Sequence, residues 1–442
     1  MYETITNDLL SFIRRSPSCY HAVKNIAAEL EQQGYRELSE ADTWTLAAGG
    51  KYYVCRNGSS LLSFRIPDAA RKPADCGFMI TAAHSDSPTF KIKENAELSA
   101  DPRYIRLNTE RYGGLLCSTW LDRPLSVAGK VALRTEDGIR TVLLDIDRDL
   151  VLIPNVAIHM NRTANENASY NAAVDMAPVF SDGTGKEQFR KLIASAVGAD
   201  EKDILGTDLF LYNRMPGSVW GLNGEFFSAP RLDDLQCVYA ALRGFQDAPA
   251  GGCIPLLAVL DNEEVGSCTR QGADSTFLGD CLTRICASLR ISPAEQLRML
   301  AKSFMVSADN AHAVHPNHPE YADATHRPRM NGGIVIKFNA AQRYTTDAES
   351  CALFQKLCTD AEVSVQFFTN RSDLAGGSTL GNISNSHVSL RTVDIGLPQL
   401  AMHSSYETAG TSDTADLAKV LRLFFSASLH PGKDSCAIVY PS

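Results

Sequence analysis

Two adjacent carboxylates, Glu263 and Glu264, follow an apolar run from Ile254 to Leu260. Such a run is typical of a buried strand, and unpaired charge is costly at the end of a buried element. We therefore expect a cation beside the pair. One carboxylate can then bind a metal ion while its neighbour moves a proton. A solvated acidic loop is the ordinary alternative, and the residues at other strand ends bear on the choice.

A histidine and an aspartate follow another predicted buried strand, which lies earlier in the chain. His84 comes directly after the run Gly77–Ala83, and Asp86 lies two residues later. In a locally extended chain the two side chains lie on one side, which suits a metal ligand and the residue that orients it. Taken alone, His84 is better explained as a lone polar loop histidine.

Further carboxylate and imidazole groups stand at three other predicted element ends. Asp233 and Asp234 precede a helical pattern; helix capping explains one aspartate, whereas a carboxylate that bridges two metal ions gives the pair a second purpose. Asp309 follows the strand predicted at 304–308, and His403 comes shortly after the strand predicted at 393–397.

Together these side chains predict a metal centre at the carboxyl ends of a sheet, where ligands collect in open α/β folds. A set of five such groups is enough for two divalent ions ~3.5–4 Å apart. Nitrogen and oxygen ligands without cysteine suit Zn²⁺, Mn²⁺ or Co²⁺. In this hypothesis Glu263 takes a proton from a metal-bound water, the hydroxide attacks a polarised amide carbonyl, and Glu263 returns the proton to the leaving amine. The five predicted ligands are His84, Asp233, Glu264, Asp309 and His403.

Length, charge and cysteine pattern limit the possible classes of protein. A chain of 442 residues, 44% hydrophobic and 21% charged, indicates a globular protein of two domains, or of one domain with a large insertion. A net charge of −9 argues against nucleic-acid or anionic-membrane partners. The 12 scattered cysteines, the absence of signal-peptide features at the N-terminus and the lack of a long apolar stretch predict a cytoplasmic protein with reduced thiols.

The element pattern predicts an α/β chain interrupted by a β-rich segment. We place a catalytic domain in 1–91 and 229–442, and an inserted domain in 92–228, where strand patterns dominate. Two helices are expected within 3–34, a hairpin around Asn57-Gly58, and a closing helix over 413–429.

Five motifs, in order along nearly the whole chain, resemble the M18 metallopeptidases, the aspartyl aminopeptidase family. They are HSDSP at 84–88, RLDD at 231–234, DNEEVGS at 261–267, SADNAHAVHPN at 307–317 and PQLAMHS at 398–404. The resemblance implies a zinc-exopeptidase-type αβα sandwich with an inserted β-rich lid and dimerisation domain. It also implies a tetrahedral homododecamer built from dimers, with the active sites facing an inner chamber.

The resemblance also implies a role for each residue of the metal centre. Asp233 would bridge two divalent ions, Zn²⁺ first and Mn²⁺ or Co²⁺ as alternatives, and the other four ligands would be terminal. Glu263 would be the general base, and Asp86 would orient His84. His159, in the β-rich segment, would be lent by a neighbouring subunit to steady the substrate carbonyl; a role as zinc ligand is the alternative.

Substrate recognition is implied at a second set of positions. Lys337 would receive the acidic side chain of an N-terminal Asp or Glu, and His312 and His326 would line the same pocket. Gly377, Ser378 and Thr379 would hold backbone or carboxylate groups of the peptide. Gly376 and Tyr406 differ from residues frequent in the family, which bears on substrate preference and leaves the ligand set intact.

Two other functions use the same features. A deacylase of N-acyl amino acids could employ the same metal centre without an oligomeric chamber. A catalytically idle self-assembling shell predicts missing ligands, yet Glu263 and all five ligand positions are filled. The leading hypothesis is therefore an aminopeptidase that hydrolyses the N-terminal peptide bond, with preference for Asp and Glu.

Overall fold

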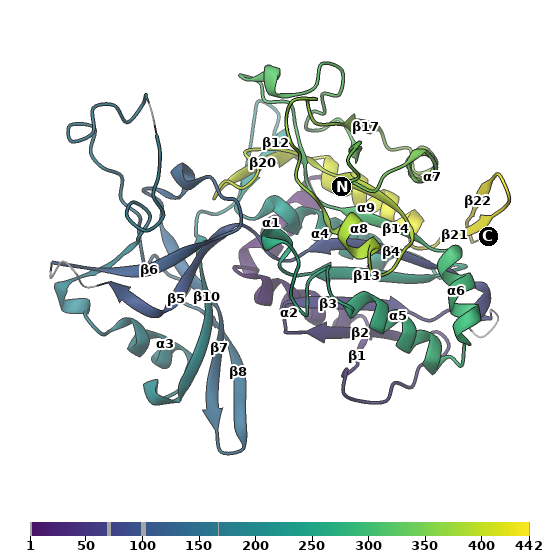
Figure 1. The fold of residues 1–442 in the computed structure, drawn as a ribbon, viewed down its shortest axis with the longest axis horizontal. Coiled ribbons are helices and arrows are strands. Elements are labelled where there is room, and N and C mark those ends of the chain that lie inside the picture. Colours follow the sequence, from purple (N-terminus) through teal and green to yellow (C-terminus); the bar gives the residue numbers. More distant parts are fainter. Residues whose placement is uncertain (1, 69–71, 99–102, 167, 442) are drawn as a thin grey trace.

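The structure is a computed structural model that describes residues 2–68, 72–98, 103–166 and 168–441. It has two bodies side by side, the larger built around a nine-stranded sheet and the smaller around a six-stranded sheet (Figure 1). No helix within the described ranges is both long and apolar enough to cross a bilayer. The cytoplasmic location stays a prediction.

The nine-stranded sheet is mixed and organises the larger body. Its strands lie, in spatial order, as β1 (Arg36–Glu37), β2 (Lys51–Arg56), β3 (Ser60–Arg65), β13 (Ile254–Leu260), β4 (Phe78–His84), β14 (Phe304–Ala308), β18 (Arg391–Gly396), β16 (Ile334–Lys337) and β17 (Val365–Phe368). The hairpin expected around Asn57-Gly58 is confirmed as β2 and β3.

The centre of this sheet is parallel, which determines where its polar residues meet. β13 pairs in parallel with β4, β4 with β14, and β14 with β18. Every residue of β4 and β13 is buried, as expected for central strands covered on both faces. Because parallel strands end at one edge, the residues that follow β4, β13 and β14 come together there.

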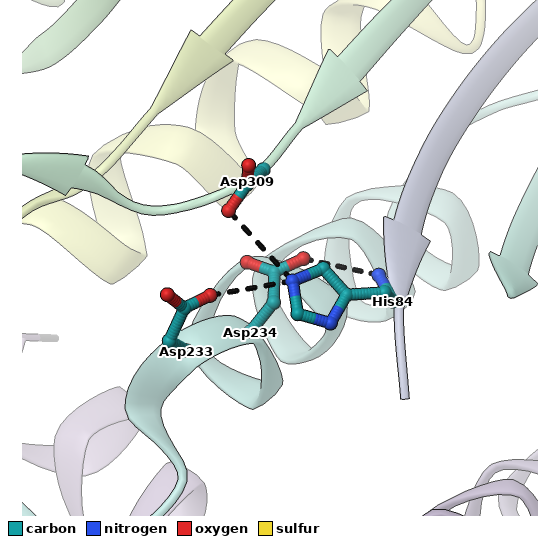
Figure 2. A group of neighbouring side chains, drawn as sticks. All are labelled: His84, Asp233, Asp234 and Asp309. Atoms are coloured by element: carbon teal, nitrogen blue, oxygen red, sulfur yellow. Dashed lines mark hydrogen bonds and ion pairs between the residues drawn. The ribbon is translucent and has the colours of Figure 1, made fainter. Parts of the chain in front are cut away.

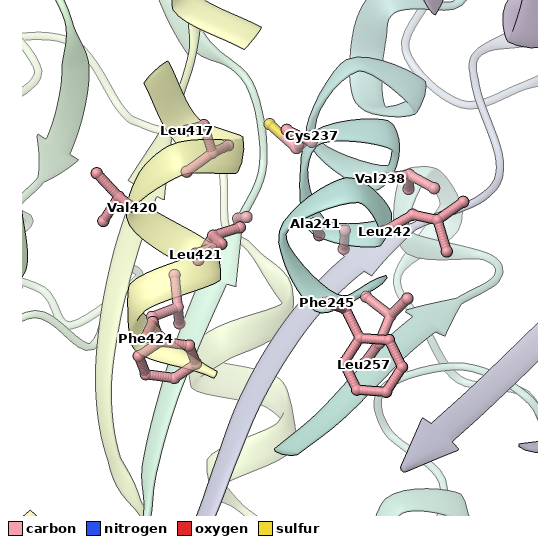
Figure 3. Close-up of a cluster of buried hydrophobic side chains, with 14 of the residues drawn as sticks. Cys237, Val238, Ala241, Leu242, Phe245, Leu257, Leu417, Val420, Leu421 and Phe424 are labelled. Atoms are coloured by element: carbon pink, nitrogen blue, oxygen red, sulfur yellow. The ribbon is translucent and has the colours of Figure 1, made fainter. Parts of the chain in front are cut away.

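Helices cover both faces of the sheet and complete an αβα sandwich, as predicted. One face carries α1 (Tyr2–Arg15), α2 (Cys19–Gln32), α4 (Leu232–Asp247), α7 (Ala348–Asp360) and α9 (Asp413–Phe424), and the other carries α5 (Phe277–Ser288), α6 (Pro293–Ala301) and α8 (Leu380–Asn385). Figure 3 shows α4 between α9 and strand β13. Phe245 of α4 and Leu257 of β13 belong to the same cluster of buried hydrophobic side chains. Because nearly all of α4 is buried, the position of its first turn, which bears Asp233, is fixed.

The six-stranded sheet forms the smaller body with its own hydrophobic core. It is antiparallel, and α3 (Phe189–Val197) packs against it. The strands lie as β8 (Gly138–Asp145), β7 (Leu125–Thr135), β10 (Ile204–Asn213), β5 (Thr89–Leu98), β6 (Tyr104–Tyr112) and β9 (Val179–Asp182). The β-rich character expected for this part of the chain is present, whereas domain boundaries at 92 and 228 stay a prediction.

A five-stranded sheet places two segments distant in sequence side by side. In spatial order it contains β11 (Ser218–Trp220), β12 (Phe226–Ala229), β20 (Glu407–Gly410), β19 (Pro398–Leu400) and β15 (Ala311–His312). Ala229, at the end of β12, pairs with Glu407, at the start of β20. This pairing brings the segment before Asp233 against the segment after His403.

The two N-terminal helices are confirmed, but the expected closing helix over 413–429 is too long. α9 ends at Phe424, and the chain continues into a hairpin of β21 (Ser428–Pro431) and β22 (Cys436–Val439). Leu429, the last residue of the expected helix, is buried in β21 instead. No Gly or Pro lies close to Phe424 in the sequence to mark the end of the helix.

Candidate active site

His84 stands at the centre of a group of aspartates at the carboxyl end of β4 (Figure 2). Its Nε2 lies 3.3 Å from Asp233 Oδ1 and 3.7 Å from Asp309 Oδ1. Its backbone N–H donates to Asp234 Oδ2 at 3.1 Å. His84 comes from β4, the aspartate pair from the first turn of α4, and Asp309 from the end of β14.

A second group of candidate ligands shares Asp233 with the first. His403 Nε2 lies 3.6 Å from Asp233 Oδ2 and 3.4 Å from Glu264 Oε2. One oxygen of Asp233 therefore faces His84, and the other faces His403. All five residues predicted as ligands are brought together by this arrangement; their assignment as ligands stays a prediction.

Several oxygens in these groups are buried without a hydrogen-bond partner, which is the condition that a bound cation relieves. They are Asp233 Oδ1, Asp234 Oδ1 and Glu264 Oε1. Ligand atoms lie within 4.8 Å of one another in three sets: His84 with Asp233, Asp234 and Asp309; His84 with Glu263 and Glu264; and Asp233 with Glu264 and His403. Imidazole and carboxylate donors of this kind fit a divalent zinc-type ion.

The pKa values of the carboxyl groups also favour a bound cation. Burial, and then the charge of Asp233, raise the pKa of Glu264 well above its ordinary value. Burial likewise raises the pKa of Asp234. Asp309 differs, because Lys337 and His84 outweigh its burial and hold its pKa below the usual range. Divalent cations would supply the charge that allows the remaining carboxyl groups to ionise together.

Glu263 lies in the short 3-10 turn η5 (Glu263–Val265) that directly follows β13. The carboxylate of Asp86 accepts hydrogen bonds from the backbone N–H groups of Glu263, at 3.1 Å, and Glu264, at 3.2 Å. Burial raises the pKa of Glu263 to about 8, while His84 lowers it and Asp309 raises it. We call the five predicted ligands, His84, Asp233, Glu264, Asp309 and His403, the ligand cluster. A carboxylate with an elevated pKa beside this cluster suits proton transfer near neutral pH.

Asp86 contacts His84 as expected and has a second set of partners that the sequence did not suggest. His84 Nδ1 lies 3.0 Å from the backbone oxygen of Asp86 and 3.4 Å from its Oδ1. Because Nδ1 is engaged there, Nε2 is free to face Asp233 and Asp309. The same carboxylate supports the Glu263–Glu264 backbone, so Asp86 joins the two halves of the site.

Glu407 was not identified from the sequence, yet it contacts two of the predicted ligands. Its Oε2 accepts from the backbone N–H of Asp233 at 3.0 Å, and its Oε1 accepts from that of His403 at 2.7 Å. The side chain is buried, and burial raises its pKa well above the ordinary value. Its only sequence signal was an acidic residue four positions after His403, which no periodicity or motif distinguished.

The predicted substrate residues divide between two adjoining pockets. Lys337, His312 and residues 377–379 line the pocket that contains Glu263 and the ligand cluster. His326 lines a neighbouring pocket, and His312 borders both. His312 and His326 thus share the neighbouring pocket, whereas the pocket of Glu263 is lined by His312 without His326.

Lys337 is buried and already paired in this structure. Its Nζ donates to the backbone oxygen of Asn310 at 2.8 Å and lies 3.3 Å from Asp309 Oδ2. Burial lowers the pKa of Lys337, but the charge of Asp309 outweighs burial, so the pKa stays above its ordinary value. A permanent cation at the pocket wall can attract an anionic group of a substrate.

His159 does not lie in the ligand cluster of its own chain. It stands on an exposed loop between the β-rich strands, and it belongs to none of the three sets of candidate ligand atoms found among the described residues. The same loop exposes Val156, Ile158 and Met160.

Comparisons with known proteins agree on one family. Residues 12–425 match the family model described as aminopeptidase I zinc metalloprotease (M18). The chain is 45% identical over 426 residues to a probable M18 family aminopeptidase 2 of Clostridium novyi, covering 95% of this chain and 98% of that protein.

Solved structures show the same fold. A chain in the cryo-EM structure of the Ape4 and Nbr1 complex superposes with a TM-score of 0.92 at 34% identity, covering 96% of this chain and 86% of the other. The S. cerevisiae mApe1 dodecamer gives a TM-score of 0.82 at 27% identity, covering 96% and 97%.

Proposed function

Because the chain belongs to the M18 family of aminopeptidase I zinc metalloproteases, and is thus a hydrolase that acts as an aminopeptidase, we propose that it uses two metal ions and prefers Asp or Glu at the N-terminus of its substrates. Zn²⁺ is the proposed ion, with Mn²⁺ and Co²⁺ as alternatives. Family membership favours peptides over N-acyl amino acids as substrates, and the filled ligand positions argue against an idle shell.

The position of Asp233 carries the proposal of two ions. Its two oxygens face two different histidines, at 3.3 Å and 3.6 Å, and each histidine has a further carboxylate beside it. A single ion would use one side of this carboxylate and leave the other side buried among like charges. His84 and Asp309 would hold one ion, His403 and Glu264 the other, and Asp233 both.

Bound ions would polarise the scissile carbonyl and lower the pKa of the attacking water. Glu263 is positioned to take the proton of that water, because it lies on the turn beside the ligands and lines the same pocket. It would then give the proton to the leaving amine. Asp86 keeps the Glu263 backbone in place through the hydrogen bond at 3.1 Å.

The charge of Lys337 supports the preference for acidic N-termini. Its side chain is buried at the wall of the pocket, so it is fixed in position and poorly screened by solvent. His312 and the loop at 377–379 line the same pocket and offer polar groups to the peptide. His326 would act from the adjoining pocket, which His312 borders.

We further propose that the chain assembles as a tetrahedral dodecamer built from dimers, and that His159 acts in the site of a neighbouring subunit. The mApe1 dodecamer has a similar fold at 27% identity. The exposure of His159, with three exposed apolar neighbours on its loop, supports a role between subunits. Under this proposal the β-rich insertion at 92–228 is a lid and dimerisation domain.

The deciding experiment is hydrolysis of a panel of aminoacyl nitroanilides, before and after chelation and after addition of single metals. The proposal expects turnover of the Asp and Glu compounds, lost with chelator and restored by Zn²⁺, Mn²⁺ or Co²⁺. Metal content should approach two ions per chain. Turnover of apolar compounds alone would contradict the proposed acidic preference, and a content of one metal ion per chain would contradict the two-ion site.

Oligomeric state is tested separately by light scattering on the eluted protein. The proposal expects a mass near twelve times the 48.1 kDa of the chain. Mixing an inactive Glu263→Gln chain with an inactive His159→Ala chain and reassembling them should restore part of the activity if His159 acts across an interface. A monomeric mass with full activity would contradict both points.

A further inference from the structure

A short segment of the six-stranded sheet body reaches into the candidate active site. We call Tyr112–Leu116, which begins at the last residue of strand β6, the strap. The backbone oxygen of Gly114 lies 2.6 Å from His403 Nδ1, and the backbone N–H of Leu116 donates to the oxygen of His403 at 3.0 Å. The strap therefore contacts a predicted ligand from outside the αβα sandwich.

Tyr112 makes the contact at the other end of the strap. Its hydroxyl donates to Asp86 Oδ2 at 2.8 Å and accepts from Asn262 Nδ2 at 2.8 Å. Asp86 holds the backbone N–H groups of Glu263 and Glu264, and Asn262 is the residue directly before them. One hydroxyl thus touches both supports of the turn that presents the proposed general base.

The turn needs such support because its backbone is unfavourable. Asn262 has a φ of 65°, in the left-handed region, and its Oδ1 accepts from Thr269 Oγ1 at 2.8 Å and from Gln271 Nε2 at 2.9 Å. The bond from Asn262 Nδ2 to Tyr112 holds the amide nitrogen of the same side chain. Asp86 is buried and Asn262 is half-buried, so loss of the tyrosine hydroxyl leaves the Asp86 carboxylate one hydrogen bond short away from bulk water.

We propose that Tyr112 is a positioning residue for the aminopeptidase reaction, which fixes the carboxylate of Glu263 through Asp86 and Asn262. This inference rests on the proposed role of Glu263 as general base. Proton transfer depends steeply on the position of the base, so a loosened turn reduces turnover before it reduces binding. Tyr112 does not line the pocket that holds Glu263, and its hydroxyl is occupied by Asp86 and Asn262, so it acts through these two residues.

The hydroxyl can be removed without removing the ring. The ring of Tyr112 packs edge-on against Phe210 with centroids 5.4 Å apart, and a phenylalanine keeps that contact. Tyr112→Phe therefore isolates the two hydrogen bonds. Tyr53→Phe is the matched control, because Tyr53 OH donates to Glu31 Oε1 at 2.6 Å away from the ligand cluster.

The test combines kinetics with hydrogen exchange on the metal-free and metal-loaded protein. Tyr112→Phe is expected to lower kcat about 10-fold or more with KM changed less than 2-fold. In the metal-free protein, the amides of Glu263 and Glu264 should exchange at least about 10-fold faster than in the unchanged protein. Tyr53→Phe should change neither kcat nor those two exchange rates.

A double substitution tests whether the effect passes through Asn262. Asn262→Gly removes the side chain and tolerates the positive φ. If both residues act on one turn, the loss of kcat in Tyr112→Phe/Asn262→Gly is smaller than the product of the two single losses. Multiplicative losses, or unchanged exchange of the Glu263 amide, would overturn the proposal.

Glu263→Gln, measured in parallel, separates this inference from the function on which it rests. If Glu263→Gln is inactive and Tyr112→Phe equals the unchanged protein, Tyr112 has no positioning role while the base assignment stands. If Glu263→Gln keeps its activity, the base assignment fails, and the inference fails with it.

Discussion

His403 Nδ1 and the backbone oxygen of Gly114 lie 2.6 Å apart, although the two residues are 289 positions apart in the sequence. A carbonyl oxygen can only accept, so this contact places the proton of the neutral imidazole on Nδ1. Nε2 is left free toward Asp233 and Glu264. A segment beyond the αβα sandwich therefore determines which nitrogen of a predicted ligand is available.

Gly113→Ala should damage the site by displacing this segment. Gly113 has a φ of 76°, and an added Cβ would lie 3.2 Å from both Cβ and the backbone oxygen of Glu264. Left-handed backbone costs an alanine about 1–2 kcal/mol, and the close approach adds to that. We expect lower metal content and a kcat at least ~10-fold lower. Gly198→Ala is the control, since Gly198 has a φ of 64° with open space around it; equal effects in both variants would assign the loss to backbone strain alone.

Glu263→Gln should keep the fold and the bound metal but remove turnover. The amide retains the shape of the side chain and the backbone bond to Asp86, while it cannot take a proton. A loss on the order of 10²–10⁴ in kcat is expected for a general base. Metal analysis and the melting temperature serve as controls, and retained turnover would exclude Glu263 from the role.

Lys337→Met should reduce turnover of acidic N-termini more than that of apolar ones. Lys337 also pairs with Asp309, so some loss on every substrate is expected. The informative quantity is the ratio of kcat/KM for Asp- and Leu-nitroanilide, which should fall at least ~10-fold. Lys130→Met, at a half-buried lysine that donates to Asn57, should leave the ratio unchanged. An equal loss on both substrates would contradict recognition of the acidic side chain by Lys337.

Removal of metal should destabilise the protein, and Asp234→Asn should reverse part of that effect. Ions that bind only the folded state stabilise it, so chelation lowers Tm. Asp234 is fully buried with an unpaired Oδ1 among other carboxylates, and its neutral replacement relieves repulsion in the chelated protein. We expect Asp234→Asn to raise the Tm of the chelated protein by a few degrees and to lower metal affinity. A lower Tm in both states would mean that Asp234 acts through packing.

The stability of the protein should fall in mild acid because of His21. Burial lowers the pKa of His21 to about 4 in the folded state, against an ordinary value of 6.5. Between these values the unfolded chain binds a proton that the folded chain does not, so stability is lost as pH falls from 6.5 to 4. The loss is on the order of 2–3 kcal/mol. Chemical denaturation at pH 7.5 and pH 5 should show a smaller difference for His21→Gln, and parallel differences would assign the acid sensitivity to other groups.

Much of the architecture followed from the sequence because its strongest patterns are local. The apolar runs before His84, Glu263 and Asp309 predicted three strands, and the parallel pairing found in the structure gives their ends a shared edge. The same reasoning predicted that all five candidate ligands lie in one site. The end of α9 was misplaced because no Gly or Pro close to Phe424 marks it in the sequence, and β21 follows after only three residues.

The supports of the site were not predictable, because they depend on contacts between distant segments. Glu407 acts through its position beside Ala229 in the five-stranded sheet, and Tyr112 through a strap from another sheet. Neither lies in a periodic pattern or next to a ligand in the sequence. Asp86 was found as a partner of His84, but its bonds to the Glu263 and Glu264 backbone require the β4–β13 pairing.

The order in which the ligands occur along the chain bears on when activity can arise during synthesis. His84 is made early, but His403 and Glu407 are added only after more than four hundred residues. Because Asp233 and Glu264 take their positions beside His403, a partly synthesised chain lacks one side of the proposed two-ion site. We therefore expect ribosome-bound intermediates to be inert as peptidases, with hydrolytic activity arising only after the segment of His403 and Glu407 has joined the fold.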